Sequence, residues 1–220
     1  MNCVLKTTLV AFALLVVIST TIFAKTKTNK TVMTNINLIE YAILHCSATP
    51  EGREYTGFQL ADYHLKPVEL GGRGFSRPGY NKVIRLDGTI DSLLTDNGDE
   101  YVDDEEVSWG VWGTTNKKAV NVCYVGGLAK DCKTPKDTRT REQLKAMESL
   151  IWYYIHISPS IKIGGHHQFG VYNNGVLDKV KNNKACPSFW VPDWLRTIGV
   201  PEQNIFTADP FNYQKIFGKK

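Results

Sequence analysis

Two histidines and one cysteine, far apart in the 220 residues, constrain the fold of this chain more than any other feature. His45 follows a short apolar run, His166 follows Gly164-Gly165, and Cys186 comes twenty residues after His166. Two imidazoles and a thiolate can form a three-ligand zinc site whose fourth tetrahedral position stays open, as in catalytic zinc sites. The pattern therefore predicts Zn²⁺ as cofactor and hydrolysis as chemistry, in a fold that brings these segments together.

Strand-like and helix-like segments alternate along the chain. Apolar or alternating runs predict strands at 41–45, 80–86, 89–94, 119–125 and 161–164. Asp87-Gly88 separates the second run from the third, which predicts a β-hairpin. Helices are predicted at 56–65 and behind Thr140 and Gln143, whose spacing forms a capping box. The alternation predicts an α/β fold: a single domain with a central mixed β-sheet flanked by helices, and the zinc site at the C-terminal ends of the strands.

Each proposed ligand has a structural alternative. His45 and His166 both follow predicted strands, where an ordinary hydrogen-bonded histidine is also common. Neighbouring side chains on a strand point to opposite faces, so His166 and His167 cannot both face one metal. We predict His166 as the ligand and His167 as a supporting or bordering residue. Cys186 can serve as a zinc-bound thiolate or, alternatively, as a disulfide partner.

Two further side chains are candidates for catalysis. Lys184 lies two residues before Cys186, and an extended segment would place both side chains on the same side. Tyr80 follows a glycine-rich loop, and a phenol near zinc can stabilise an oxyanion or transfer a proton. The competing interpretations are a solvated lysine in a basic run and an ordinary strand aromatic.

The N-terminal residues have the composition of an export signal. Residues 1–24 combine Lys6, an apolar run and a final small residue, Ala24, which predicts a cleaved signal peptide and an exported protein. A membrane anchor through residues 9–24 is the alternative, although that run is short for a bilayer span. Residues 25–36 are polar and basic and predict a linker.

The charge is unevenly distributed. The net charge is +4, yet the segment 96–106 carries seven acidic residues and no basic residue. The chain outside this segment is basic, which suits binding to an anionic polymer such as a cell wall. A nucleic acid would require the same sign, but the sequence has no nucleic-acid-binding motif, so no such partner is expected. For the acidic segment we favour a solvated loop over a gate or a cation site.

Four cysteines follow the predicted signal peptide, and the sequence does not decide which of them form disulfides. Cys123 and Cys132 are close enough in sequence to pair across a turn. Cys46 and Cys123 also suit small buried strand positions. Aromatic residues that could line a substrate groove are Phe75, Trp109, Trp112 and Trp190.

Several short motifs, in this order, resemble those of the type-2 N-acetylmuramoyl-L-alanine amidase family, which includes phage lysozyme-type amidases and peptidoglycan recognition proteins. The motifs span residues 40–195 and are His45–Thr49, Tyr63-His64, Arg73–Phe75, Gly79-Tyr80, Ile84–Ile90, Val122–Gly127, Thr138–Gln143, His166-His167 and Lys184–Phe189.

The resemblance implies an amidase domain at 37–200, followed by a C-terminal extension at 201–220. It implies that His45, His166 and Cys186 bind zinc, that Tyr80 and Lys184 are catalytic, and that the substrate is peptidoglycan. Members that lack the cysteine bind without cleaving, so a non-catalytic recognition protein is the alternative. This chain departs from the family at Asn81, where a histidine is usual, in the acidic segment, and in an insert at 169–181.

Overall fold

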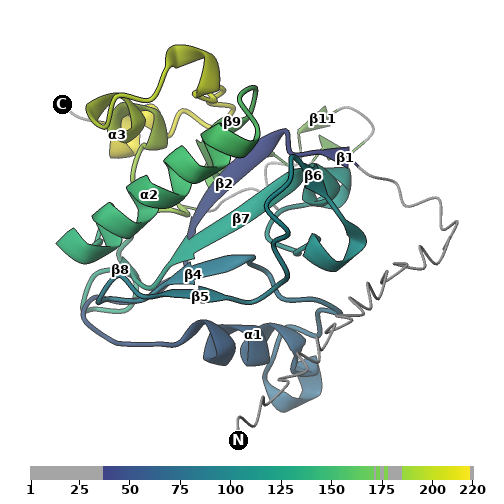
Figure 1. Ribbon diagram of the computed structural model, residues 1–220. Coiled ribbons are helices and arrows are strands. Elements are labelled where there is room, and N and C mark those ends of the chain that lie inside the picture. The colour runs from purple at the N-terminus through teal and green to yellow at the C-terminus, as the bar shows by residue number, and fades with distance from the viewer. Residues whose placement is uncertain (1–36, 171, 174–175, 178–184, 219–220) are drawn as a thin grey trace, which may run out of the picture. The chain divides into compact units, whose positions relative to one another are not determined.

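A five-stranded sheet organises the computed structural model, which describes residues 37–170, 172–173, 176–177 and 185–218 (Figure 1). The strand order is β5-β4-β7-β2-β9. Their bounds are β2 (Tyr41–Cys46), β4 (Lys82–Ile84), β5 (Ile90–Ser92), β7 (Ala119–Tyr124) and β9 (Lys162–Gly165). All neighbours are parallel except β4 and β5. The antiparallel pair confirms the hairpin predicted around Asp87-Gly88, and the sheet is mixed, as predicted.

Among the described residues, three small two-stranded sheets accompany the main one. They pair β1 (Asn37–Leu38) with β6 (Tyr101–Val102), β3 (Thr49–Pro50) with β8 (Gly127–Leu128), and β10 (Tyr172–Asn173) with β11 (Val176–Leu177). The described residues belong to one compact unit. The predicted signal peptide and linker, residues 1–24 and 25–36, lie outside them.

Helices cover both faces of the main sheet. The helices are α1 (Gly57–Leu65), α2 (Arg141–Ile157), α3 (Val191–Thr197) and α4 (Gln214–Phe217). Short 3₁₀ turns lie at Val68–Leu70, Asp104–Glu106, Gly113–Lys118, His166–Gln168 and Glu202–Asn204. Figure 1 shows α2 crossing one face of the sheet and α1 lying on the other.

The long helix α2 starts where the sequence predicts. The Thr140 hydroxyl accepts a hydrogen bond from the Gln143 amide, and the Gln143 side chain accepts one from the Thr140 amide. Gln143 is fully buried, and its side-chain nitrogen also donates to the carbonyls of Ile84 and Val125. The cap therefore joins the start of α2 to β4 and to the end of β7.

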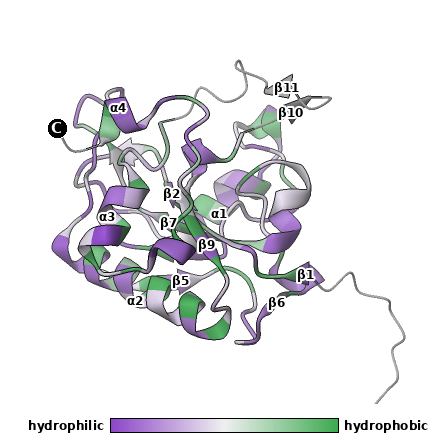
Figure 2. Cartoon of the chain, turned by 90° about the horizontal axis from the view of Figure 1, so that it is seen from above, coloured by the Kyte–Doolittle hydropathy of each residue, from purple (hydrophilic) through white to green (hydrophobic). Residues whose placement is uncertain are grey.

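The larger apolar core lies between the sheet and α2. Alternate residues of β2, including Ala42 and Leu44, pack there with Met147 and Ile151 of α2. Around α2 and α3 in Figure 2, hydrophobic and hydrophilic residues share each turn, as expected for helices with one buried face. A smaller core on the other face contains Leu60 of α1.

Much of the acidic segment 96–106 is solvated, as predicted, since Asp99, Glu100, Asp104 and Glu105 are exposed, but two of its residues are buried. Val102 is buried in the large core. Glu106 is buried as well, and its carboxylate accepts hydrogen bonds from the amides of Asn97 and Asp103. Asp96 forms an ion pair with Lys82 at 2.9 Å. Internal hydrogen bonds to the buried carboxylate offset its loss of water, which is why an acid-rich segment can pack here.

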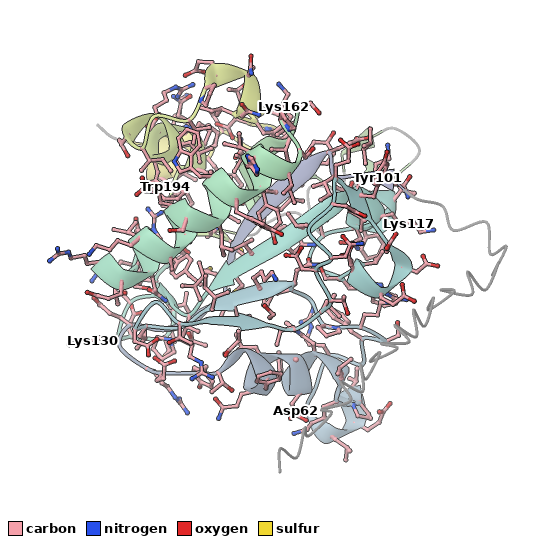
Figure 3. All side chains as sticks on the ribbon, in the orientation of Figure 1. Asp62, Tyr101, Lys117, Lys130, Lys162 and Trp194 are labelled. Carbon is pink, nitrogen blue, oxygen red and sulfur yellow. The ribbon has the colours of Figure 1, made fainter. Side chains whose placement is uncertain are left out.

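Basic residues reach the surface of the described part of the chain, although acidic residues outnumber them there. Lys117 and Lys130 are exposed, and Figure 3 shows them at the outside of the molecule, far apart from each other.

Cys46, Cys123, Cys132 and Cys186 are free thiols, so Cys123 and Cys132 are not paired. Within the described ranges, a helix with the length and apolarity of a bilayer span is absent.

Candidate metal centre

The three predicted ligands meet at one point of the structure. A ring nitrogen of His45, a ring nitrogen of His166 and the sulfur of Cys186 lie within 4.8 Å of one another. His45 is near the C-terminal end of β2, and His166 directly follows the parallel strand β9. Cys186 precedes α3. Parallel neighbours end on the same edge of a sheet, so the topology itself brings the two histidines together.

The donor set fits a metal with an accessible side. His45 is only 1% exposed, whereas His166 and Cys186 are half-buried. The Cys186 sulfur lies 3.7 Å from His45 Nδ1 and accepts a hydrogen bond from the Cys46 amide at 3.2 Å. Burial raises the pKa of the Cys186 thiol well above its usual range. A bound cation would supply the positive charge that such a buried thiolate needs, and two imidazoles with one thiolate suit zinc.

His167 holds the cysteine loop in place. The carbonyl of Cys186 accepts hydrogen bonds from the backbone amide of His167 at 2.9 Å and from its ring Nδ1 at 2.8 Å. His167 is 2% exposed and stacks on Trp190. Burial lowers the pKa of His167 to about 4, so its ring is neutral at pH 7. His167 thus supports the site by fixing the ligand that follows it, through what we call the His167–Cys186 clamp.

Tyr80 lies beside the ligands. Its ring centroid is 5.2 Å from that of His45 and 5.0 Å from that of His64. Burial raises the pKa of Tyr80 well above its usual range, so the phenol keeps its proton at neutral pH. Such a hydroxyl can donate a hydrogen bond to a developing negative charge.

His64 supports the segment that carries Tyr80. Its Nδ1 accepts a hydrogen bond from the amide of Gly79 at 3.2 Å. Burial, with a smaller contribution from the charge of Arg73, lowers the pKa of His64 to about 4. A Cβ added at Gly79 would lie 2.9 Å from the His64 ring, so the close approach requires glycine. The motif Tyr63-His64 drew attention to this residue, but its contact with Gly79 depends on the fold.

Three of the four aromatic candidates reach the surface. Trp109 and Trp112 are exposed, and Phe75 is half-buried between His64 and Trp109, with ring centroids 5.6 and 6.0 Å away. Trp190 is 4% exposed and belongs to the interior, so it cannot line a groove.

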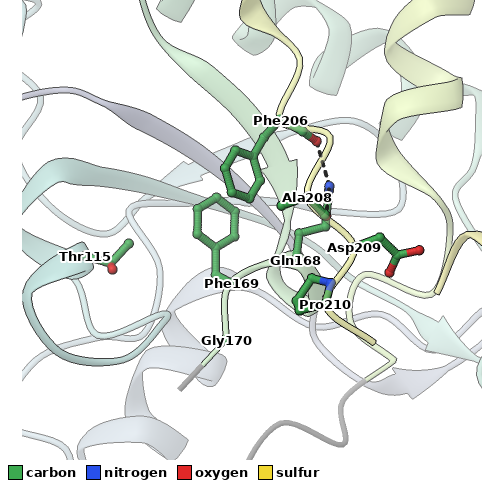
Figure 4. Close-up of a pocket in the computed structure, with 8 residues that line it drawn as sticks. All are labelled: Thr115, Gln168, Phe169, Gly170, Phe206, Ala208, Asp209 and Pro210. Atoms are coloured by element: carbon green, nitrogen blue, oxygen red, sulfur yellow. Dashed lines mark hydrogen bonds between the residues drawn. The ribbon is translucent and has the colours of Figure 1, made fainter. Parts of the chain in front are cut away.

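A pocket of about 460 Å³ opens on the same face of the sheet as His45. Gly164 pairs with Ile43, two residues before His45, and a Cβ at Gly164 would contact Phe169, Phe206 and Gln168. Figure 4 shows Phe169 beside Phe206, and Gln168 bonded to the Phe206 carbonyl.

Sequence reasoning missed the partner of His45. Asn121 of β7 is fully buried, and its Oδ1 lies 2.8 Å from His45 Nε2. Because β7 is otherwise almost entirely apolar, one asparagine within it gives little sign of a contact with β2. Asn81, at the position where the family usually has histidine, is also buried and accepts a hydrogen bond from the Asn121 amide. Lys184, the predicted partner of Tyr80, lies outside the described residues.

A solved structure shows the same fold. Apis mellifera PGRP-SA matches 80% of this chain and 89% of its own, with 15% identity and a TM-score of 0.50. The chain has the peptidoglycan recognition protein fold. This confirms, at the level of the fold, the resemblance found in the sequence. Drosophila PGRP-LB matches 70% of this chain and 78% of its own, with 20% identity and a TM-score of 0.46. No family model matches the sequence, and no curated protein does.

Proposed function

We propose that this chain is a zinc-dependent N-acetylmuramoyl-L-alanine amidase. It hydrolyses the amide bond between the lactyl group of N-acetylmuramic acid and L-alanine in peptidoglycan. The observation that carries the proposal is the third donor: the Cys186 sulfur accompanies the nitrogens of His45 and His166 within 4.8 Å. With that sulfur the group can hold a metal and keep one position open for the reaction.

In this mechanism His45, His166 and Cys186 hold the metal. A zinc ion held there would supply a water whose pKa is lowered to about 7 and would polarise the carbonyl under attack. The His167–Cys186 clamp fixes the cysteine loop. His45 is held inside the protein, while His166 and Cys186 are half-buried and leave part of the site accessible.

Tyr80 and Lys184 are the proposed catalytic residues. The protonated phenol of Tyr80 donates a hydrogen bond to the tetrahedral oxyanion or passes its proton toward the leaving amine. Lys184, two residues before the ligand Cys186, supplies a fixed positive charge for the same oxyanion. Each such donor contributes about 3–4 kcal/mol to transition-state stabilisation.

Peptidoglycan as substrate is supported by the order of the sequence motifs, by the fold and by the basic body of the chain. The exposed Trp109 packs next to Phe75, and the Phe75 ring stacks on His64. His64 in turn contacts Tyr80. Aromatic faces of this kind suit sugar rings. Export through the signal peptide at residues 1–24 would bring the enzyme to a cell wall.

The test is digestion of purified peptidoglycan by the full chain, with and without a zinc chelator, followed by mass spectrometry of the products. We expect free stem peptides beginning with L-alanine, intact glycan strands, loss of cleavage on chelation and recovery with zinc. Retention of folded, zinc-loaded protein on peptidoglycan without any cleavage would instead identify a non-catalytic recognition protein.

A further inference from the structure

We infer that a buried polar relay, formed by Asn81, Ser108 and Asn121, selects the tautomer of His45 that binds the metal. The three relay side chains and the His45 ring are between 0% and 4% exposed, so they cannot exchange their hydrogen bonds with water. The relay is a positioning device for the proposed zinc site, and in that sense the inference rests on the proposed function.

The orientation of Asn81 is set by the backbone at both ends of its amide. Its Oδ1 accepts a hydrogen bond from the backbone amide of Asn121 at 2.8 Å. Its Nδ2 donates to the carbonyl of Glu106 at 2.6 Å. A backbone amide can only donate and a backbone carbonyl can only accept. A flipped Asn81 would place two donors together and two acceptors together, so its oxygen must face Ser108.

As a consequence, the hydroxyl proton of Ser108 must point to Asn81. Ser108 Oγ lies 2.6 Å from Asn81 Oδ1, and an amide oxygen can only accept, so the hydroxyl donates to it. The remaining lone pairs of Ser108 face the Asn121 side chain at 2.8 Å. Only the nitrogen of the Asn121 amide can complete that contact. The opposite orientation would leave a buried acceptor without a proton.

The oxygen of Asn121 therefore faces His45 at 2.8 Å, and His45 Nε2 must carry the proton. In the neutral ring the other nitrogen, Nδ1, is then the acceptor. Nδ1 is the atom that lies 3.7 Å from the Cys186 sulfur, on the side of the proposed metal. A ligand histidine needs this arrangement, with one nitrogen for the metal and the other donating to a fixed partner.

The first measurement is the tautomer of His45 in the metal-free full chain, from long-range ¹H–¹⁵N correlation spectra of the histidine rings. We expect Nε2–H for wild type and a mixture of both tautomers for Ser108→Ala, which removes the oxygen that accepts from the Asn121 side-chain nitrogen. An Nδ1–H ring in wild type would overturn the inference. This readout does not depend on zinc binding, so it separates the relay from the proposed function.

The second measurement is zinc affinity by chelator competition. Asn121→Leu preserves the size of the side chain but removes the acceptor, and we expect affinity to fall about 10–100-fold. Asn121→Asp keeps an acceptor toward Nε2, and the Ser108 hydroxyl can turn from Asn81 to donate to the second carboxylate oxygen, so the affinity should be retained. An unchanged affinity in folded Asn121→Leu would overturn the inference; if this variant does not fold, Ser108→Ala takes its place, with a loss of affinity expected.

A matched control distinguishes positioning from general stability. Asn204 is 1% exposed and donates to the carbonyls of Pro159 and Ile161, outside the relay. Asn204→Leu should lower the melting temperature without changing zinc affinity. Equal losses of zinc affinity in Asn204→Leu and Asn121→Leu would mean that the relay only stabilises the fold and does not position His45. Failure of wild type to bind zinc would refute the metal site, while the tautomer spectra would still decide the relay.

Discussion

The strand β2 presents Ala42 and Leu44 to α2 on one face of the sheet and His45 to the opposite face. The α2 face is a continuous apolar core. The opposite face contains a smaller apolar cluster, a buried polar relay and the ligand His45 of the candidate metal centre, whose ligand Cys186 also touches the larger core. The comparison shows that alternate residues of one strand can have different roles. One set packs in the apolar core and stabilises the fold, and the other contributes to the candidate site. Each prediction below tests whether the two faces are separable.

The largest effect is expected from loss of the cysteine ligand. Cys186→Ser removes the thiolate, and zinc affinity should fall by more than the roughly 100-fold limit typical of residues that only support a ligand. Peptidoglycan cleavage should disappear with it. Chelator competition and product analysis provide the measurements, and circular dichroism should show an unchanged fold. Full cleavage by the serine variant would remove Cys186 from the mechanism.

Substitution of the proposed catalytic pair should separate turnover from metal binding. Tyr80→Phe and Lys184→Ala each remove one donor to the oxyanion, and we expect kcat to fall about 10²–10³-fold. Zinc content should stay at the wild-type level, because neither residue is a proposed ligand. Kinetics with a muramyl peptide and metal analysis of the same samples would show this. Wild-type turnover in either variant would withdraw the role assigned to that residue.

The α2 face should behave in the opposite way. Ile151 is fully buried against the sheet. Ile151→Ala leaves a cavity and should lower the free energy of unfolding by about 2–5 kcal/mol. Zinc affinity below the unfolding transition should not change. Urea denaturation and chelator competition are the two measurements, and a coupled loss of affinity would show that the faces are not independent.

The smallest effect concerns pH. The pKa of His64 is lowered from 6.5 to about 4, so between these values the unfolded chain binds a proton that the folded chain excludes. The stability present above pH 6.5 should therefore decline as the pH falls toward 4. His64→Phe should flatten this part of the profile in thermal denaturation. An identical slope in both proteins would mean that His64 titrates normally.

Local signals made much of the fold predictable from the sequence. Asp87-Gly88 located the hairpin, and Thr140 with Gln143 located the start of α2, because turns and caps depend on neighbouring residues. The two histidines at predicted strand ends indicated a candidate metal site, and the structure brings them together with Cys186. What escaped prediction depends on register between distant segments. Asn121 meets His45 only because β7 pairs with β2 in one particular register.

The acidic segment is largely solvated, as predicted, but its buried residue Glu106 could not be foreseen for a related reason. Its composition suggests full solvation, but the two carboxylate oxygens of Glu106 accept hydrogen bonds from the amides of Asn97 and Asp103. Composition alone does not reveal such internal partners. The role of Lys184 stays a prediction based on spacing and resemblance.

The His167–Cys186 clamp has a consequence for how this protein can diversify. The two hydrogen bonds at the Cys186 carbonyl join the end of β9 directly to the loop before α3, so the ends of the intervening segment are tied together at its base. Closing a longer segment costs little additional entropy, about 0.6 kcal/mol for each doubling of length. The length of the chain between Gly170 and the proposed catalytic Lys184 can thus vary while the clamp keeps the spacing of the candidate ligands.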